Sequence, residues 1–460
     1  MFKIVSIPTL YSQEQRFLRW SGIVAIIAFL TFSVGIWNQP FIDFETRFAL
    51  FAKEMLRNGI SFFPTTYGKP YPDYPVTSTL AIFLFAKLFG LFNKFIAVLP
   101  TIFASTGIVA LTFLLLVRSS LNWAIATICF EWITFTFLMQ SRTISLDQMV
   151  SLITLASFYV AYQSQISPFK RERLWLVLLF IAGFLVRGPI GIIIPAAVIG
   201  SYFCITKNFR NALTWGLIAL ATILIMWLAQ LGLAWRQEGL GFVQAVIRMQ
   251  VTERMNLVDY QPFYYYFLSS FGSFAPTYPL FAIVSIIFLF YRKSLTGSVG
   301  YVLMLGLISW VVVIMFGLSI PHTKKFHYLL PIVPPLCAIS SYPFAVEALP
   351  RLKVFLKSFL SIYPILLLVI LMYGEKLLAN KGIDVRQQVS WAVIALVLMQ
   401  LASVMTLLLR SLLPYQTGLI FGAAALASWF CIVLVVEPTL NKLHDTSIFV
   451  AQAEPKIRPV

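Results

Sequence analysis

"SGIVAIIAFLTFSVGIWNQPFIDFETRFAL", residues 21–50, joins an apolar run to a cluster of acids. The part up to Trp37 has the composition and nearly the length of a helix that crosses a bilayer, which takes about 20 residues. No small-residue cleavage site follows it, so it predicts a retained helix rather than a signal peptide. Asp43, Glu45 and Arg47 come directly after it, in a chain with only 17 acidic residues among 460. The sequence therefore places a rare acidic cluster at the far end of the first helix.

The whole chain shares the apolar character of this first run. Hydrophobic residues make up 60% and charged residues 11% of the chain, and the mean hydropathy is +0.87. A soluble domain carries about 25% charged residues. Phe alone supplies 42 residues, a load that lipid-facing helices tolerate and a water-exposed surface does not. We therefore predict an all-α polytopic membrane protein that forms one helical unit.

The net charge of +17 also fits a membrane protein. Lys and Arg collect in cytoplasmic loops by the positive-inside rule. No basic patch stands outside the membrane segments, so we expect no nucleic-acid partner. The cysteines lie within apolar runs and form no CxxC motif, which indicates small buried hydrophobes rather than disulfides or metal ligands; they are Cys129, Cys204, Cys337 and Cys431.

Apolar runs of sufficient length predict about 13 transmembrane helices, with the N-terminus in the cytoplasm and the C-terminus outside. They are residues 20–37, 95–117, 121–139, 146–162, 174–186, 189–205, 212–234, 272–290, 299–318, 328–345, 357–373, 389–409 and 415–436. We expect the run 76–92 not to cross, because Pro72 and Pro75 precede it and a crossing would put basic clusters outside. The alternative is that 76–92 crosses and 174–205 is a single helix, which Pro189 argues against.

Residues 44–57 predict an interfacial helix within the first outer loop, residues 38–94. Apolar side chains recur on one face at helical spacing: Phe44, Phe48, Phe51 and Met55. Such a helix lies in the membrane plane and would hold Asp43 and Glu45 at the water–lipid boundary. The alternative is that these acids only hydrate a loop.

Charged residues from at least five loops collect on the same outer side. Asp73 is the only acid of the Tyr- and Pro-rich loop 65–78, and Arg187 lies at the tip of a hairpin of two short apolar runs. A charge at that depth has a carboxylate partner or an anionic ligand. Loops that converge at one end of a helix bundle are typical of active sites. The set is Asp43, Glu45, Arg47, Glu54, Asp73, Arg142, Asp147, Arg187, Arg248, Glu253, Arg254, Asp259, His322, Lys324, Lys325 and His327.

The order of these pieces resembles one family. Acids and an arginine follow the first helix, and after them come "AKEMLRNG" (52–59), a Tyr/Pro loop with one acid, "SRTISLD" (141–147), "RGP" (187–189) and "KKFHYLLPIVPP" (324–335). Over about residues 20–340 the chain resembles the C-type glycosyltransferases, with the GT-C fold, of the bacterial protein-mannosyltransferase and aminoarabinose-transferase superfamily.

The resemblance implies that a sugar moves from a polyprenyl (undecaprenyl) phosphate to an acceptor on the periplasmic face of the bacterial inner membrane. The acceptor is lipid A in the aminoarabinose branch and a protein Ser or Thr in the mannosyltransferase branch. The implied catalytic acids are Asp43, Glu45 and Asp147. The implied donor contacts are Arg47, Tyr71, Arg187, Arg254 and Tyr328, and the implied metal-associated acid is Asp73.

The sequence departs from the family pattern in three places. Phe44 separates two acids that are adjacent in the family, while Glu45 and Arg47 keep the register, so either acid remains a candidate base. Asp73-Tyr74-Pro75-Val76 replaces the usual Glu-Lys-Pro-Pro and lacks its lysine. We also expect no large soluble C-terminal domain. Instead we predict a catalytic module at 1–345 and further transmembrane helices at 346–460.

The chemistry of sugar transfer gives each kind of predicted site residue a role. One of Asp43 and Glu45 can take the acceptor proton. Cationic side chains, including Lys324 or Lys325, can hold the phosphate. Asp73, with Glu45 or Asp43, could bind a divalent cation such as Mg, Mn or Zn. One displacement at the anomeric carbon predicts an inverting enzyme without a covalent glycosyl intermediate.

Two other classes of membrane protein remain as alternatives. A lipid-linked-sugar flippase or transporter would place polar residues near the midplane on discontinuous helices, and Glu131 and the runs broken at Pro189 and Pro195 favour it. A non-catalytic assembly protein would not need converging acids and arginines. The main prediction is a monomeric glycosyltransferase with a polyprenyl-phosphate sugar donor and a lipid or protein acceptor.

Overall fold

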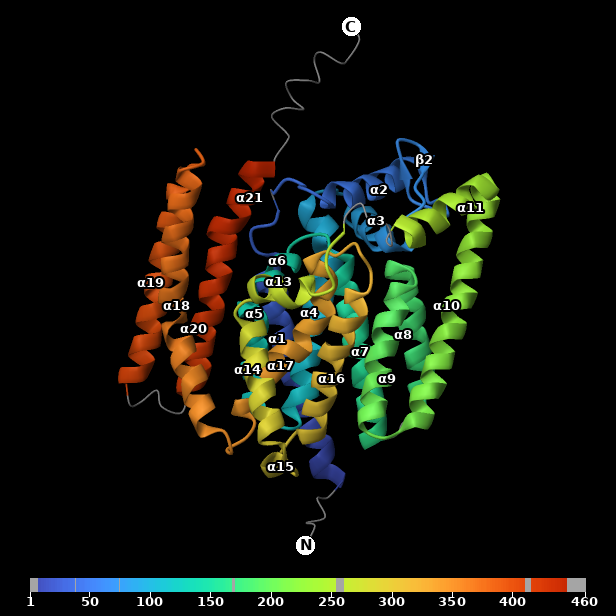
Figure 1. Cartoon of the computed structure of the whole chain (residues 1–460). Helices are drawn as coiled ribbons and strands as arrows, with labels where there is room; N and C mark the ends of the chain where they lie inside the picture. The colour runs from blue at the N-terminus through green and yellow to red at the C-terminus, as the bar shows by residue number, and fades with distance from the viewer. Residues whose placement is uncertain are drawn as a thin grey trace.

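A computed structural model describes residues 7–37, 39–73, 75–167, 170–253, 260–409 and 415–444 as a bundle of α-helices with one short β-hairpin (Figure 1). The first half of the chain forms α1 (Ile7–Ser33), α2 (Glu45–Asn58), β1 (Thr65–Thr66), β2 (Lys69–Pro70), α3 (Thr77–Phe89), α4 (Lys94–Val117), α5 (Leu121–Ile133), α6 (Phe135–Gln140), α7 (Leu146–Ile166), α8 (Glu172–Arg187), α9 (Ile190–Ile205) and α10 (Phe209–Glu238). The all-α fold predicted from composition is confirmed.

The second half adds helices on both flanks. It forms α11 (Leu240–Ile247), η1 (Arg248–Thr252), α13 (Tyr265–Ser273), α14 (Thr277–Phe290), α15 (Arg292–Leu295), α16 (Tyr301–Ser319), η3 (Phe326–Ile332), α17 (Val333–Ser340), η4 (Tyr342–Phe344), α18 (Pro350–Ala379), α19 (Arg386–Leu408), α20 (Gln416–Cys431), η6 (Ile432–Val436) and α21 (Glu437–His444). The boundary predicted between residues 345 and 346 falls between η4 and α18.

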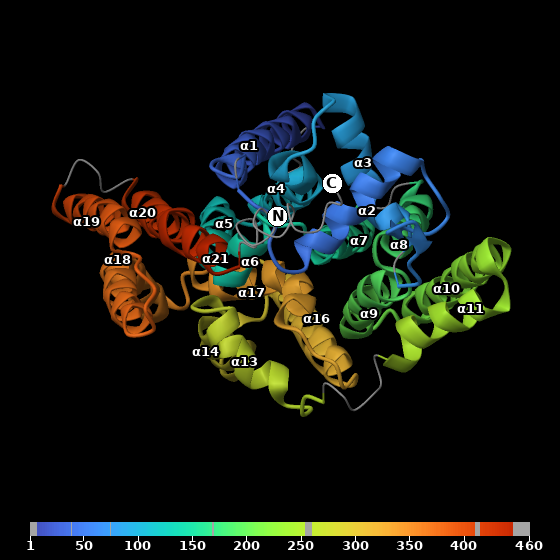
Figure 2. The same ribbon diagram turned by 90° about the horizontal axis from the view of Figure 1, so that it is seen from above.

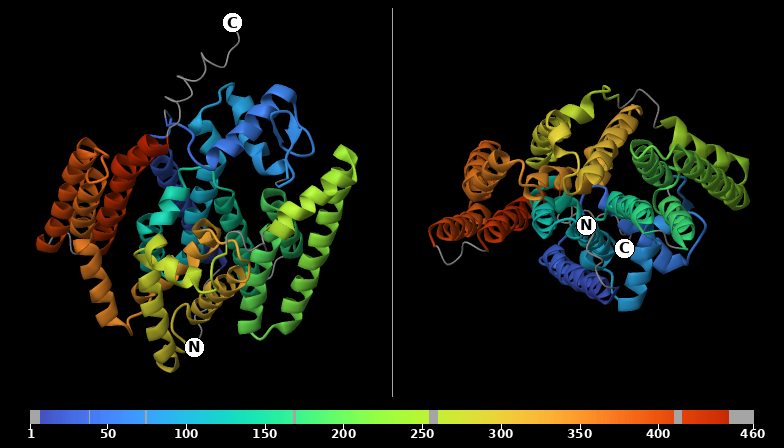
Figure 3. Two further views of the ribbon diagram at one scale, coloured as in Figure 1. Left: turned by 45° about the horizontal axis from the view of Figure 1, so that its top comes forward. Right: turned by 90° about the horizontal axis from the view of Figure 1, so that it is seen from below.

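The bundle has a centre, two flanks and one elaborated end. Helices α4, α5, α7 and α17 lie in the middle, with α8–α10 on one flank and α18–α20 on the other (Figures 1 and 2). The view from below shows the same two flanks (Figure 3). Helices α2, α3 and α11 and the β1–β2 hairpin gather at one end, which we call the outer end. Residues 38–94, the predicted first outer loop, therefore cap this end of the bundle.

Seven of the described helices are long and apolar enough to cross a membrane, and up to eight segments qualify if the bent pair α13 and α14 forms one span. That pair turns by 116° at its break. Shorter apolar helices, among them Thr77–Phe89, Leu121–Ile133 and Ile190–Ile205, fall below this length. The chain is a multi-pass membrane protein, but the predicted count of thirteen crossings is not confirmed.

The structure divides several predicted spans differently. The run 121–139 is broken at Thr134 into α5 and α6, and the run 328–345 begins as the 3-10 helix η3 before α17. Pro331, inside η3, lacks the N–H that a regular α-helix requires. Residues 174–205 form two helices, so the alternative of one helix there is wrong.

Helix α2 confirms the helix predicted at residues 44–57. Phe48, Phe51 and Met55 are buried, as its periodicity predicts, whereas Phe44 precedes the helix and is exposed. Glu54 is also buried, and it accepts hydrogen bonds from the Thr65 hydroxyl and the Gly68 amide of the hairpin. This acid of the first outer loop therefore organises the loop itself.

One buried arginine connects both ends of the chain. Arg142 is 1% exposed, and its guanidinium binds both carboxylate oxygens of Glu437 in α21. It also donates to the carbonyls that end α1, at Thr31, Phe32 and Val34, over 2.7–3.2 Å. These bonds use all five N–H donors of an arginine. Arg142 therefore has no donor left for a substrate phosphate and serves to join α1 to α21.

We expect Arg142→Lys to destabilise the protein by about 2 kcal/mol, because lysine keeps the charge but cannot make the bidentate contact and several carbonyl bonds at once. The measurement is the midpoint of unfolding in detergent. Arg236→Lys, at an exposed position near the end of α10, is the matched control. Equal midpoints for the two variants would contradict this structural role.

Candidate active site

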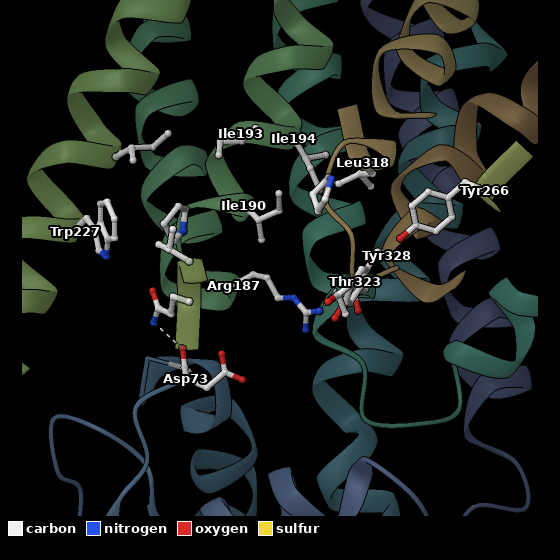
Figure 4. Close-up of a pocket in the computed structure, with 16 residues that line it drawn as sticks. Asp73, Arg187, Ile190, Ile193, Ile194, Trp227, Tyr266, Leu318, Thr323 and Tyr328 are labelled. Carbon is white, nitrogen blue, oxygen red and sulfur yellow. Dashed lines mark hydrogen bonds and ion pairs between the residues drawn. The ribbon is translucent and has the colours of Figure 1, made fainter. Parts of the chain in front are cut away.

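A cavity of about 460 Å³ lies between the outer end and helices α7–α10 and α16 (Figure 4). One wall is apolar, and the opposite side carries the charged and aromatic polar groups. Its lining residues are Asp73, Asp147, Arg187, Pro189, Ile190, Ile193, Ile194, Ile223, Trp227, Gln250, Val251, Tyr266, Leu318, Pro321, Thr323 and Tyr328. An amphipathic ligand, apolar at one end and anionic at the other, matches this division.

The α8–α9 turn presents Arg187 to the cavity. Gly188, with φ +67°, ends α8 in a conformation that other residues rarely adopt, and Pro189 is the N-cap residue of α9. Below the turn, Gly183 and Gly191 face each other so closely that a Cβ on Gly191 would lie 2.0 Å from the Gly183 carbonyl oxygen. The two helices can approach each other only with glycine at both positions. This packing sets the position of Arg187.

Asp147 faces Arg187 from the first turn of α7. An Asp147 carboxylate oxygen lies 3.2 Å from Arg187 Nη2. The helix N-terminus favours a negative charge at this position. Tyr328 completes the group, because its ring centre lies 5.3 Å from the Arg187 guanidinium carbon. Three residues predicted from separate loops therefore meet on one side of the cavity.

Glu45 does not reach this cavity. It is 1% exposed and lies 2.8 Å from the Lys94 ammonium at the start of α4. It also accepts hydrogen bonds from the backbone amides of Ile42 and Ile144, at 3.3 and 2.9 Å. Burial raises the pKa of Glu45, and the Lys94 ammonium opposes that shift. Both oxygens of Glu45 are thus engaged within the protein, and the Ile144 bond fixes the loop that leads to Asp147.

Asp43 and Arg47 also lie outside the cavity lining. The Asp43 side chain is 51% exposed, and one of its oxygens lies 3.2 Å from His444 Nδ1 in α21. Arg47 donates to the Tyr71 hydroxyl at 3.2 Å. The predicted roles of these residues stay predictions.

The predicted cationic residues of the later loops have different positions. Lys324 is buried and donates to the carbonyls of Gln261 and Pro321 at 2.9 and 2.6 Å. Lys325 is exposed, and Arg254 lies outside the described residues. Arg187 is therefore the one Lys or Arg among the described residues that line the cavity.

The predicted divalent cation does not fit the pair Asp73 and Glu45. Asp73 lines the cavity, whereas Glu45 is held by Lys94 and two amides. Within the described ranges, no group of three His, Cys, Asp or Glu residues has the proximity to hold a metal ion. A cation at Asp73 stays a prediction, and no reaction step is assigned to it.

His327 is a site residue whose contacts the sequence did not predict. Its ring stacks on Phe44, with ring centres 5.6 Å apart, and its Nε2 lies 3.9 Å from the second oxygen of Asp147. Its Nδ1 is buried and accepts or donates no hydrogen bond within the described part of the chain. The sequence showed a histidine next to Tyr328 but gave no sign that it would face Asp147.

Gln250, Trp227 and Tyr266 also line the cavity without having been predicted. The Gln250 amide donates to the Asp73 carbonyl at 2.6 Å and so holds that loop against η1. The Tyr266 hydroxyl accepts from the Lys325 amide and donates to its carbonyl. Neutral side chains in apolar surroundings carry no sequence signal that distinguishes them from core residues.

Comparisons with known proteins agree with the predicted resemblance. No family model matches the chain. Over 354 residues it is 26% identical to an undecaprenyl phosphate-alpha-4-amino-4-deoxy-L-arabinose arabinosyl transferase from Serratia proteamaculans, which covers 73% of this chain and 61% of that protein. The chain thus spans less than two thirds of the length of this curated relative.

Two solved structures share the fold. ArnT from Cupriavidus metallidurans in the apo state matches with a TM-score of 0.74 and 16% identity. The same protein bound to undecaprenyl phosphate matches with a TM-score of 0.75 and 17% identity. Each match covers 96% of this chain and 81% of the other. The chain is therefore similar to a protein of the predicted superfamily, and the predicted fold is confirmed.

Proposed function

We propose that this chain is a membrane glycosyltransferase that moves a sugar from a polyprenyl phosphate to a lipid A-like lipid or another acceptor. The observation that carries the proposal is the cavity in which Arg187, Asp147 and Tyr328 meet an apolar wall. The name of the Serratia relative and the undecaprenyl phosphate bound to the Cupriavidus protein support it. We place the site on the periplasmic face of the bacterial inner membrane, with a cytoplasmic N-terminus and a monomeric chain.

The donor's two ends fit the two sides of the cavity. Ile190, Ile193 and Ile194 form part of the apolar wall and suit the first isoprene units. Arg187 suits the phosphate, because a guanidinium donates two parallel hydrogen bonds to phosphate oxygens. Asp147 keeps Arg187 in place through the 3.2 Å contact.

Asp73 is the carboxylate best placed to accept the acceptor proton. In an inverting displacement the acceptor attacks the face of the sugar opposite the leaving phosphate. Asp147 touches Arg187 and so lies on the phosphate side, whereas Asp73 lies apart from Arg187 and Tyr328 (Figure 4). The acceptor oxygen bonds to the anomeric carbon and gives its proton to Asp73. The bond from that carbon to the phosphate oxygen breaks, and its electron pair remains on the phosphate beside Arg187.

The test is sugar transfer by the purified protein in detergent. Radiolabelled undecaprenyl-phosphate sugars are offered with a lipid A extract or a Ser/Thr peptide pool, with and without a chelator. Labelled lipid supports the proposed acceptor, labelled peptide indicates the mannosyltransferase alternative, and loss with chelator supports the predicted cation. Movement of the lipid-linked sugar across a liposome membrane without transfer would indicate a flippase and contradict the proposal.

Asp73→Asn is expected to lower kcat about 10²-fold with little change in donor affinity, because a general base contributes 10²–10⁴-fold. Asp43→Asn tests the rival candidate base in the same outer loop, and we expect it to keep its activity, since Asp43 is half-exposed and outside the cavity lining. Initial rates over a range of donor concentrations measure both kcat and KM. If Asp43→Asn lost activity and Asp73→Asn kept it, the base would be Asp43, as the family resemblance allows.

A further inference from the structure

The segment from α2 to the start of α4, residues 45–94, buries its acidic side chains, whereas its exposed charged side chains are basic. The buried acids are Glu45, Glu54 and Asp73. Glu45 and Glu54 are engaged within the protein, with Lys94 and with the β1–β2 hairpin. The exposed charged side chains are Lys53, Arg57, Lys69 and Lys87. Residue 74, outside the described ranges, is a tyrosine and therefore neutral near pH 7, so the exposed charge of this segment is positive.

Two of these lysines lie at one edge of the segment. Lys87 belongs to the last turn of α3, and its ammonium lies 5.9 Å from the centre of the Phe83 ring. Lys53 of α2 places its ammonium 5.7 Å from the centre of the Phe92 ring, in the turn between α3 and α4. We call Lys53 together with residues 84–92 the α3 edge. An aromatic ring attracts an ammonium group without neutralising it, so both lysines keep their charge for an anion.

Aromatic contacts place α3 at the depth where a membrane span ends. Phe103 of α4 contacts both Phe29 of α1 and Phe85 of α3, with ring centres 5.3 and 5.6 Å apart. Phe29 lies near the outer end of α1, one of the helices long and apolar enough to cross a membrane. The α3 edge exposes large apolar side chains beside its lysines: Leu84, Leu88, Phe89 and Leu91. Exposed apolar groups next to ammonium groups suit the boundary between acyl chains and lipid phosphates.

We propose that the α3 edge binds the phosphate groups of anionic lipids in the bilayer half at the outer end, with Lys53 and Lys87 as the phosphate contacts. A headgroup with net negative charge attracts lysines at the membrane surface, whereas the ammonium of a zwitterionic headgroup offsets its phosphate. The bound lipid steadies α3, whose first residue reaches the candidate active site: the Thr77 hydroxyl donates to the Leu185 carbonyl, two residues before Arg187. This inference goes beyond the proposed function and requires no sugar transfer.

The experiment measures which lipid quenches a fluorophore at the α3 edge of the full-length protein in nanodiscs. Leu88→Cys carries a bimane label, in a background with Cys204→Ser because Cys204 is an exposed cysteine. The same background without Leu88→Cys measures labelling elsewhere. Brominated phosphatidylglycerol and brominated phosphatidylcholine are the quenchers, each titrated to give a local association constant. Each lysine near an anionic headgroup favours binding roughly 5-fold, so we expect phosphatidylglycerol to be preferred roughly 25-fold.

Lys53→Gln combined with Lys87→Gln should abolish this preference. Lys376→Gln combined with Lys381→Gln is the matched control and should keep it, because these exposed lysines lie at the outer end of α18 and in the turn after it, near the acid Asp384 (Figure 1).

The outcomes are independent of the transferase assay. Equal quenching by the two lipids with both lysines present, or a preference that persists in the Lys53 and Lys87 double variant, would overturn the proposal. A second measurement needs no lysine variant: raising the ionic strength from about 0.05 M to about 0.5 M should weaken the preference, because salt screens exposed charges. A preference that salt leaves unchanged would also overturn it. Since no sugar is transferred, a failed transferase test leaves this result standing.

Discussion

Arg187→Ala is expected to lower kcat/KM for sugar transfer about 10³-fold, the upper range for loss of one preorganised charge donor. The guanidinium is the one cation of the described cavity lining, so both donor binding and stabilisation of the leaving phosphate should be lost. Arg187→Lys should recover only part of this activity, because an ammonium does not form the bidentate contact. Initial rates over a range of donor concentrations separate the effect on kcat from the effect on KM.

Two controls show whether the loss is chemical or structural. Removing Arg187 leaves Asp147 buried without the partner that lies 3.2 Å away, so some destabilisation accompanies the loss. Arg187→Ala combined with Asp147→Asn should recover the stability but not the activity. Arg236→Ala, at an exposed site of α10, should behave like the unaltered protein. Near-normal kcat/KM in a folded Arg187→Ala variant would exclude this cavity as the phosphate site.

Glu45→Gln is expected to destabilise the protein by about 3–5 kcal/mol, because it leaves the buried ammonium of Lys94 without its counter-charge. The two side chains lie 2.8 Å apart and are 2% exposed or less. Thermal unfolding in detergent measures the loss. The variant should also lose activity, since Glu45 holds the Ile144 amide in the loop that leads to Asp147.

The double variant Glu45→Gln with Lys94→Met separates the effect of Glu45 on stability from any role in catalysis. Replacing a buried ion pair with neutral side chains of similar size is often neutral for stability. We therefore expect the double variant to recover most of the stability and most of the activity. A stable double variant that remains inactive by more than about 10²-fold would show that Glu45 takes part in proton transfer, as the resemblance implies.

Arg187 and Glu45 show which site features the sequence can indicate and which require the structure. Arg187 could be found from the sequence because a charge between two apolar runs, followed by Gly-Pro, is an unusual local pattern. Glu45 looked equally promising by the same reasoning. Its actual partner, Lys94, begins a helix 49 residues later, and no local pattern reports such a pairing.

The count of membrane spans shows a similar limit. Hydropathy indicated a span wherever an apolar run was long enough, and it correctly separated α8 from α9. It did not indicate the break at Thr134 or the 3-10 turn η3, because side-chain hydropathy says little about the backbone conformation within a uniformly apolar run. Hydropathy likewise did not indicate the 116° bend between α13 and α14.

By itself, the sequence determined the membrane class and the helical architecture, because these depend on composition and on short periodic patterns. Only the tertiary structure decided which charges serve the cavity and which hold the protein together. Asp147 and Arg187 meet in the cavity, whereas Glu45 pairs with Lys94 and Arg142 with Glu437. The physical reason is that a buried charge is stabilised by whichever opposite charge the packed helices bring within a few ångströms, and that proximity is a property of the fold.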